Sequence, residues 1–212
     1  MRVLVTAGPT WEFIDEVRYL ASPSTGRMGL AVAEVFARAG HKVDLVSGPT
    51  HLPVPLGVNF VSVVNARQMH DAALGLLAEA DAVVMTAAVS DYRPAETLAG
   101  KKKRTGDKWV LELVENPDIL KEIGQKKGNR ILVGFAVESQ SPRQHALEKL
   151  VSKNLDFIVL NSPEAFGVEV TSVEIIDRDV TTTKLEQVTK HDVAKHILKK
   201  VKKLEKGKKR SH

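Results

Sequence analysis

Short apolar runs alternate with amphipathic segments along most of the chain, and this alternation constrains the fold more than any other feature. The apolar runs have the length of strands and lie at 2–6, 42–46, 58–64, 82–86, 131–135 and 157–160. Segments with helical periodicity lie at 26–39, 66–78, 117–127 and 142–153. Strands that alternate with helices in this way form parallel sheets with helices on both faces. The chain is therefore predicted to be a three-layer α/β sandwich with a mostly parallel sheet.

Two regions depart from the alternation. The segment 91–116 is predicted to be an antiparallel flap or arm, because a basic run at 101–104 precedes apolar residues at every second position. These apolar residues are Trp109, Leu111 and Leu113. Nearer the C-terminus, 173–177 and 182–188 are predicted to form an antiparallel pair of strands, and 191–204 a closing helix.

The net charge of +5 is concentrated at the C-terminus. Residues 199–210 hold eight cations against the single acid Glu205, so this segment carries +7 and the rest of the chain −2. A polybasic segment can contact RNA or another anionic surface, whereas cations at a helix end are also favourable without a partner. The second interpretation is favoured, and no specific nucleic acid partner is expected. We predict a single Rossmann-like domain over 1–198, followed by a basic tail at 199–212.

Several classes of protein are excluded by what the chain lacks. The absence of cysteine excludes disulfides, thiolate metal sites and a cysteine nucleophile. The seven histidines lack the spacing of a zinc site, and there is no G-x-S-x-G elbow. No apolar run approaches the ~20 residues of a membrane span, so no membrane partner and a cytoplasmic location are expected. An enzyme of this kind is expected to use a nucleotide for activation, while the protein positions the reactants and neutralises charge.

Glycine-containing turns follow the first predicted strand and precede the first predicted helix. The strand ends in Thr6-Ala7-Gly8-Pro9-Thr10, and the helix opens with Ser24-Thr25-Gly26-Arg27-Met28-Gly29, where Ser24 or Thr25 is the expected N-cap. Glycine lets the backbone approach a phosphate closely, and free N–H groups at a helix start bind anions. One such turn is commonly structural, but two that converge on one strand end predict a phosphate site.

A redox dinucleotide is the first alternative ligand for such a site. Its fingerprint requires the glycines within one short G-x-G-x-x-G turn and an acid near the end of the second strand that binds the ribose. Here a long insertion separates Gly8 from Gly26, and the second strand ends in Val46-Ser47-Gly48-Pro49. An NAD(P)-binding oxidoreductase is therefore the less favoured alternative, and a nucleic-acid-binding module that uses the basic tail is the third.

Further polar groups follow the later strands. Asp91 could accept hydrogen bonds from a ribose or help to hold a metal, or it could cap the next turn. The basic run at 101–104 could neutralise a triphosphate, or it could be a solvated loop. Lys149 and Lys153 lie at i and i+4 on one helix face, where they could face a ligand, although exposed lysines at this spacing are common.

The ordered set of motifs resembles phosphopantothenoylcysteine synthetase, the phosphopantothenate-cysteine ligase of coenzyme A biosynthesis. The resemblance spans roughly residues 1–190. The matching segments are Thr6 to Thr10, Asp15 to Arg18, Ser24 to Gly29, Ser47 to Pro49, Ala87 to Tyr92, the lysine run, Asn116 to Leu120, Gly134 to Glu138 and Lys149 to Asn161. In bacteria this family is often fused behind a flavin-dependent phosphopantothenoylcysteine decarboxylase, so a separate decarboxylase is a candidate partner.

The resemblance implies a two-step reaction that uses CTP and Mg²⁺. The carboxylate of 4'-phosphopantothenate attacks the α-phosphate of CTP and releases pyrophosphate, which gives an acyl-cytidylate. The amine of cysteine then displaces CMP and forms the amide. In the family the flap reaches over a neighbouring subunit's site, so the resemblance also implies a homodimer.

The resemblance assigns roles to individual residues. Those implied to border the cytosine are Met85, Thr86, Ala87 and Phe135. Those implied to contact phosphate are Gly8, Ser24, Thr25, Gly26, Lys101, Lys149 and Lys153. Those implied to close the nucleotide pocket are Pro117, Asp118, Ile119 and Leu120. Asp91 is implied to lie at the ribose or metal, and together with Lys101 and Ser22 it forms the implied catalytic set.

The loop before the first helix departs from the family pattern at one position. The family usually reads Ser-Asn-x-Ser-Ser/Thr-Gly, whereas this chain reads Ala21-Ser22-Pro23-Ser24-Thr25-Gly26. In the family the asparagine is tied to the acyl-cytidylate and its conversion. Serine keeps a hydroxyl donor and acceptor but lacks the reach and second donor of the amide. Ser22 is therefore expected to affect the second half-reaction more than the first.

Overall fold

The central sheet of the protein has eight strands in the order β12-β11-β10-β9-β6-β1-β4-β5. The computed structural model describes residues 1–137, 140–161 and 170–210. The strands are β1 (Arg2–Ala7), β4 (Lys42–Ser47), β5 (Asn59–Ser62), β6 (Ala82–Met85), β9 (Ile131–Val137), β10 (Phe157–Asn161), β11 (Val170–Asp177) and β12 (Thr182–Thr189). From β10 to β5 all neighbouring strands are parallel, and β11 and β12 add an antiparallel edge.

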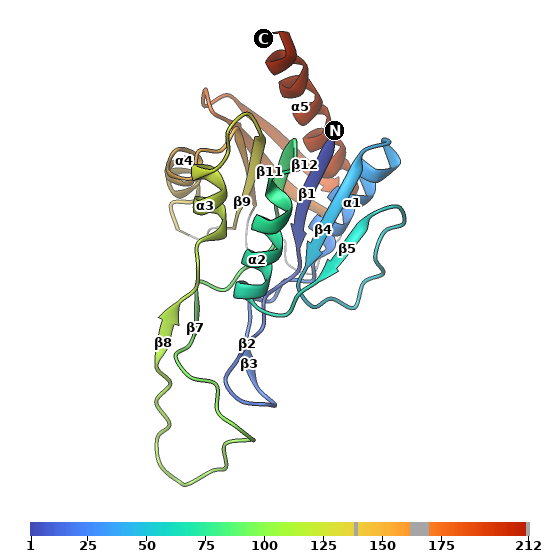
Figure 1. Ribbon diagram of the computed structural model, residues 1–212. Coiled ribbons are helices and arrows are strands. Elements are labelled where there is room, and N and C mark those ends of the chain that lie inside the picture. The colour runs from blue at the N-terminus through green and yellow to red at the C-terminus, as the bar shows by residue number, and fades with distance from the viewer. Residues whose placement is uncertain (138–139, 162–169, 211–212) are drawn as a thin grey trace.

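Helices cover both faces of the sheet, which confirms the predicted three-layer α/β fold (Figure 1). One face carries α1 (Arg27–Arg38) and α5 (Lys190–Arg210), and the other carries α2 (Ala66–Leu77), α3 (Ile119–Gln125) and α4 (Pro142–Ser152). Because successive strand residues point to opposite faces, neighbours on β1 enter different cores: Val3 and Val5 pack toward α1, and Leu4 packs toward α2. Among the described residues, no helix is long and apolar enough to cross a membrane.

Two predicted helix boundaries were wrong. Pro117 does not occupy the first turn of α3, because Asp118 is the N-cap and its carboxylate accepts the Lys121 N–H at 2.9 Å. The closing helix does not end at Leu204 but continues to Arg210, so much of the basic tail is helical. The Lys208 ammonium donates to the carbonyls of Asn129 and Arg130 at 3.1 and 2.9 Å, which fastens this extension to the body. Residues 211–212 of the predicted tail lie outside the described residues.

The predicted flap is an arm that extends away from the sandwich (Figure 1). Only its base is regular, where β7 (Tyr92–Pro94) pairs with β8 (Leu113–Glu115). Of the predicted alternating residues, Leu113 lies in β8, but Trp109 and Leu111 are not in a strand, because they lie beyond the paired base and Trp109 is 42% exposed. Apolar alternation stabilises a strand only where one face is covered.

A hairpin that the sequence did not predict lies beside the arm. It consists of β2 (Glu12–Phe13) and β3 (Tyr19–Leu20), and the Trp11 and Tyr19 rings stack at 4.3 Å between centroids. The buried Asp15 carboxylate accepts the Lys102 N–H at 3.2 Å and binds the Arg18 guanidinium. The hydrogen bond from Arg18 holds the pKa of Asp15 well below its ordinary value. The hairpin thus anchors the middle of the arm.

The turn between β11 and β12 contains a strained residue, and we expect its replacement to stabilise the protein. Val180 has a φ of 67°, a conformation that a β-branched side chain rarely adopts. Val180→Gly should stabilise the fold by about 1 kcal/mol and raise the melting temperature by about 2–4 °C. Val180→Thr keeps the branched Cβ and should give no gain. Equal melting temperatures for the two variants would contradict this account.

Candidate active site

A cavity of about 480 Å³ lies at the carboxyl ends of β6 and β9. The chain runs from β1 outward to β4 and β5 and then returns to β6 on the opposite side of β1. The strand order therefore reverses next to this cavity. Ligands of open α/β sheets bind beyond the strand ends at such a reversal. The cavity is the candidate active site.

Many of the residues implied to bind the nucleotide line this one cavity. They are Met85, Ala87, Asp91, Pro117, Asp118, Ile119, Leu120, Phe135, Lys149 and Lys153. They come from the ends of β6 and β9, the start of α3, the inner face of α4 and the base of the arm. The sheet topology alone brings together segments that are up to 68 positions apart in the sequence, from Met85 to Lys153.

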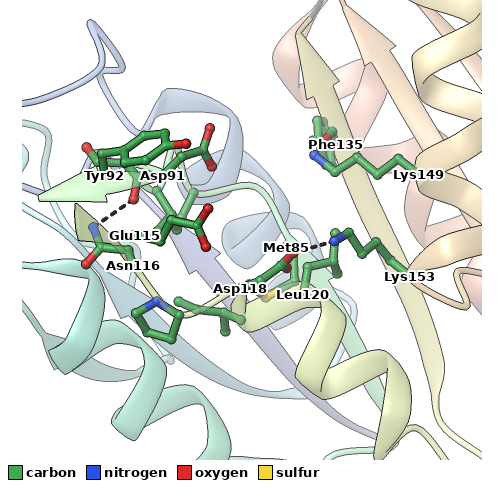
Figure 2. A pocket seen from close by; sticks show the side chains of 15 residues that line it. Met85, Asp91, Tyr92, Glu115, Asn116, Asp118, Leu120, Phe135, Lys149 and Lys153 are labelled. Carbon is green, nitrogen blue, oxygen red and sulfur yellow. Dashed lines mark hydrogen bonds and ion pairs between the residues drawn. The ribbon is translucent and has the colours of Figure 1, made fainter. Parts of the chain in front are cut away.

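The two lysines from α4 and its C-cap hold defined positions at the cavity wall. The Lys149 ammonium donates to the Phe135 carbonyl at 2.9 Å, and Lys153 forms an ion pair with Asp118 (Figure 2). Burial raises the pKa of Asp118, but the hydrogen bond from Lys153 and the Lys121 N–H outweigh it, so this pKa is lowered overall. The carboxylate therefore stays ionised and keeps Lys153 at the cavity.

Carboxylates stand across the cavity from the lysines. Asp91 and Glu115, from the two sides of the arm's base, lie opposite Lys149 and Lys153 (Figure 2). Within the described ranges, no three histidine or acidic side chains form a ready metal site. Mg²⁺ is commonly held by one or two carboxylates together with substrate phosphates, so this donor set fits a metal that enters with a nucleotide.

Five lining residues were not among the predicted site residues: Val89, Ser90, Tyr92, Glu115 and Asn116. Four of them, Val89, Ser90, Tyr92 and Asn116, lie within the quoted motifs, and Glu115 directly precedes one of these motifs. The sequence could therefore have predicted these lining residues, because the residues next to a predicted site residue at a strand end lie close to the same site. Glu138, the last residue of another quoted motif, lies outside the described residues.

The predicted phosphate loops lie on the other side of the same strand ends. Thr86 follows Met85 and so points to the opposite face, where its hydroxyl donates to the Thr6 carbonyl at 2.6 Å. A Cβ on Gly29 would overlap Thr86 and Ala7, so α1 begins directly against these strands. Gly8, Ser24, Thr25 and Gly26 gather there and do not line the cavity.

The predicted N-cap of the first helix was wrong. Gly26, with a φ of 78°, is the N-cap, and α1 has no side-chain capping hydrogen bond at this residue. A Cβ on Gly26 would lie 3.2 Å from the Gly8 backbone, and a Cβ on Gly8 would lie 2.9 Å from the Gly48 carbonyl oxygen. Gly26 thus allows the close approach of its loop to Gly8, and Gly8 allows the close approach to the loop after β4. The consequence is a helix start whose N–H groups have no side-chain cap, next to two glycine turns.

The remaining two predicted residues lie away from the cavity. Ser22 belongs to the loop between β3 and α1, and its carbonyl accepts the Ser24 N–H at 2.8 Å. Lys101 is exposed on the arm, beyond the β7–β8 pairing. Neither side chain lines the cavity of its own chain.

Comparison with known proteins gives consistent relatives. The chain is 42% identical over 204 residues to the coenzyme A biosynthesis bifunctional protein CoaBC of Bacillus subtilis, covering 94% of this chain and 50% of that protein. It is 45% identical over 170 residues to the CoaBC protein of Vibrio cholerae, covering 78% and 42%. The chain thus spans about half the length of the curated relatives it matches.

A solved structure and a family model agree with these relatives. The crystal structure of the C-terminal domain of a CoaBC protein superposes with a TM-score of 0.84 at 38% identity, covering 97% of this chain and 96% of that one. The family model described as the DNA/pantothenate metabolism flavoprotein C-terminal domain matches residues 1–204. These matches confirm the resemblance predicted from the ordered motifs: the chain belongs to the family of the DNA/pantothenate metabolism flavoprotein C-terminal domain.

Proposed function

We propose that this protein is a phosphopantothenate-cysteine ligase that activates 4'-phosphopantothenate with CTP. The observation that carries the proposal is the arrangement of Lys149 and Lys153 opposite Asp91 and Glu115 across one cavity at the strand ends. Cations that neutralise phosphate and carboxylates that can share a metal are what a nucleotide-activation site requires. The family membership and the CoaBC relatives support a role in coenzyme A biosynthesis.

In the proposed first step, the substrate carboxylate attacks the α-phosphate of CTP and pyrophosphate leaves. Lys149 and Lys153 neutralise the triphosphate, and the ion pair between Lys153 and Asp118 loosens as phosphate takes the ammonium. Phe135 and the backbone at 85–87 border the base. Asp91 would help to hold a Mg²⁺ ion that comes with the nucleotide, and this ion would supply stabilisation of negative charge on the phosphate oxygens.

In the proposed second step, the cysteine amine attacks the acyl carbon of the acyl-cytidylate and CMP leaves. Gly8 and the loop 24–26 supply backbone N–H groups that bind a phosphate on their side of the strand ends. The start of α1, which has no side-chain cap, supplies further N–H groups for the same phosphate. Ser22 lies in the same β3–α1 loop, just before residues 24–26, and takes the place of the family's asparagine, so its hydroxyl is proposed to act on this second step.

The proposal includes a homodimer, with the arm serving a neighbouring site. Lys101 is exposed on the arm, outside its own cavity, so it is proposed to meet the triphosphate in a second subunit. Large apolar side chains on the arm and hairpin are also exposed, and a partner surface would cover them. They include Val17, Trp109 and Val110 at 57%, 42% and 85% exposure. A flavin-dependent decarboxylase would act on the product.

Nucleotide selectivity tests the proposal. CTP with Mg²⁺ should raise the melting temperature, and pyrophosphate should be released when 4'-phosphopantothenate is added without cysteine. The oxidoreductase alternative lacks a ribose-binding acid where β4 ends at Ser47, and it predicts stabilisation by NADPH instead. The nucleic-acid alternative predicts salt-dependent RNA binding that is lost without residues 199–212. Stabilisation by NADPH but not by CTP would refute the ligase.

A further inference from the structure

The base of the arm leaves and re-enters the body through the wall of the candidate active site, and farther out the arm is held by the β2–β3 hairpin. The chain leaves this wall at Ser90 and Asp91 and returns to it at Glu115 and Asn116, and all four residues line the cavity. Between these two roots, β7 and β8 pair over three residues each. Such a short ladder constrains the arm weakly by itself, because an isolated two-stranded hairpin is only marginally stable.

The Asn116 side chain joins the two roots directly, and the Arg93 side chain reinforces this connection. The Asn116 Nδ2 donates to the Ser90 carbonyl at 2.8 Å, and its backbone N–H donates to the Asp91 carbonyl at 2.7 Å. The Asn116 Oδ1 accepts from the Arg93 Nη1 at 3.2 Å, and the same Arg93 nitrogen also donates to the Glu115 carbonyl. Both ends of the amide are therefore used, and both bind the outgoing side of the arm's base, at Ser90 and at Arg93.

The segment that Asn116 holds is also fixed from the other direction. The Ser90 N–H donates to the Thr10 hydroxyl at 3.0 Å, and the Thr10 N–H donates to the Ala88 carbonyl at 3.3 Å. Ser90 is thus held by the loop after β1 through its N–H and by Asn116 through its carbonyl. Loss of the Asn116 side-chain amide would remove the bond to the Ser90 carbonyl and leave the backbone bond from Asn116 to Asp91, the Arg93 bond to the Glu115 carbonyl and the short β7–β8 ladder between the two roots.

We infer that Asn116 is a positioning residue that clamps the two roots of the arm and so fixes Asp91 and Glu115 at the cavity wall. An amide is required because it donates and accepts at once: aspartate would place an oxygen against the Ser90 carbonyl, and alanine would make neither bond. The structural part of this inference is independent of the reaction, and its kinetic consequence rests on the proposed function.

Hydrogen exchange and kinetics of Asn116→Ala and Asn116→Asp test the clamp. Loss of one or two side-chain hydrogen bonds should speed amide exchange in β7 and β8 by about tenfold. The kcat/KM for pyrophosphate release should fall about 10- to 100-fold, because the Asp91 carboxylate is no longer held in its position at the cavity. Asn65→Ala is the matched control, since Asn65 caps α2 through one bond of 2.9 Å to the Gln68 N–H and does not line the cavity.

The outcomes separate the clamp from the reaction. Exchange and kcat/KM equal to those of Asn65→Ala would overturn the inference. Faster exchange with unchanged kcat/KM would overturn the positioning role, and a lower kcat/KM with unchanged exchange would show that Asn116 contacts substrate directly and would overturn the clamp. If the wild type releases no pyrophosphate, the proposed function fails, while the exchange experiment still decides whether Asn116 clamps the arm.

Discussion

Lys153→Met is expected to reduce the kcat/KM for pyrophosphate release by about 100- to 1,000-fold, the usual cost of removing a charged group that stabilises a transition state. Methionine keeps most of the side-chain volume and the apolar contacts of the stem but loses the cation. The fold should survive, because Lys153 is only the C-cap residue of α4 and its ion pair with Asp118 is partly exposed. Pyrophosphate release at saturating and limiting CTP measures the effect.

Lys121→Met is the matched control for this prediction. Lys121 is an exposed lysine on α3 whose side chain does not line the cavity, and its N–H bond to Asp118 does not depend on the side chain. It should keep nearly full activity. Equal losses in the two variants would show that total charge near α3, rather than the position of Lys153, supports the reaction.

Asp156→Ala is expected to destabilise the protein by about 3–5 kcal/mol, since it removes the partner of a buried lysine from a largely buried ion pair. The Asp156 Oδ2 lies 2.8 Å from the Lys127 ammonium, and the two side chains are 13% and 6% exposed. The same carboxylate accepts the Leu132 N–H at 2.7 Å. Burial lowers the pKa of Lys127 even with Asp156 present, so loss of the carboxylate leaves a poorly solvated cation. A melting temperature lower by about 10 °C is expected.

The paired substitution separates lost charge from lost packing. Lys127→Met removes the buried cation and leaves Asp156 with the Leu132 N–H and with Lys208 at 3.8 Å, so it should cost less than Asp156→Ala. In the Lys127→Met background, Asp156→Ala should lower the free energy of unfolding by less than it does alone, because no buried cation is left unpaired. Urea unfolding of the wild type, the two single variants and the double variant gives the coupling free energy between Asp156 and Lys127. Losses of unfolding free energy that simply add in the double variant would contradict this account.

The parts of the fold that could be predicted from sequence are those set by local pattern. The apolar run from Val3 to Val5 predicted β1 because a strand covered on both faces needs apolar residues at every position. Lys149 and Lys153 could be placed on one face because helical periodicity relates i to i+4. The positions of Asp91 and Phe135 followed from the rule that parallel strands end at one edge.

The parts that could not be predicted depend on contacts between distant segments. The β2–β3 hairpin has two-residue strands, and it is ordered by Asp15 and by the arm rather than by its own pattern. Gly26 replaced the expected cap because α1 begins against Gly8, a contact that sequence spacing does not reveal. The role of Asn116 depends on Ser90, which lies 26 residues earlier in the chain.

The most direct test of the ligase is the product balance of one complete reaction. The protein is incubated with CTP, Mg²⁺, 4'-phosphopantothenate and cysteine, and the products are identified by mass spectrometry. The account predicts 4'-phosphopantothenoylcysteine, with one CMP and one pyrophosphate for each amide formed. Absence of both pyrophosphate and any cytidylate product would contradict it.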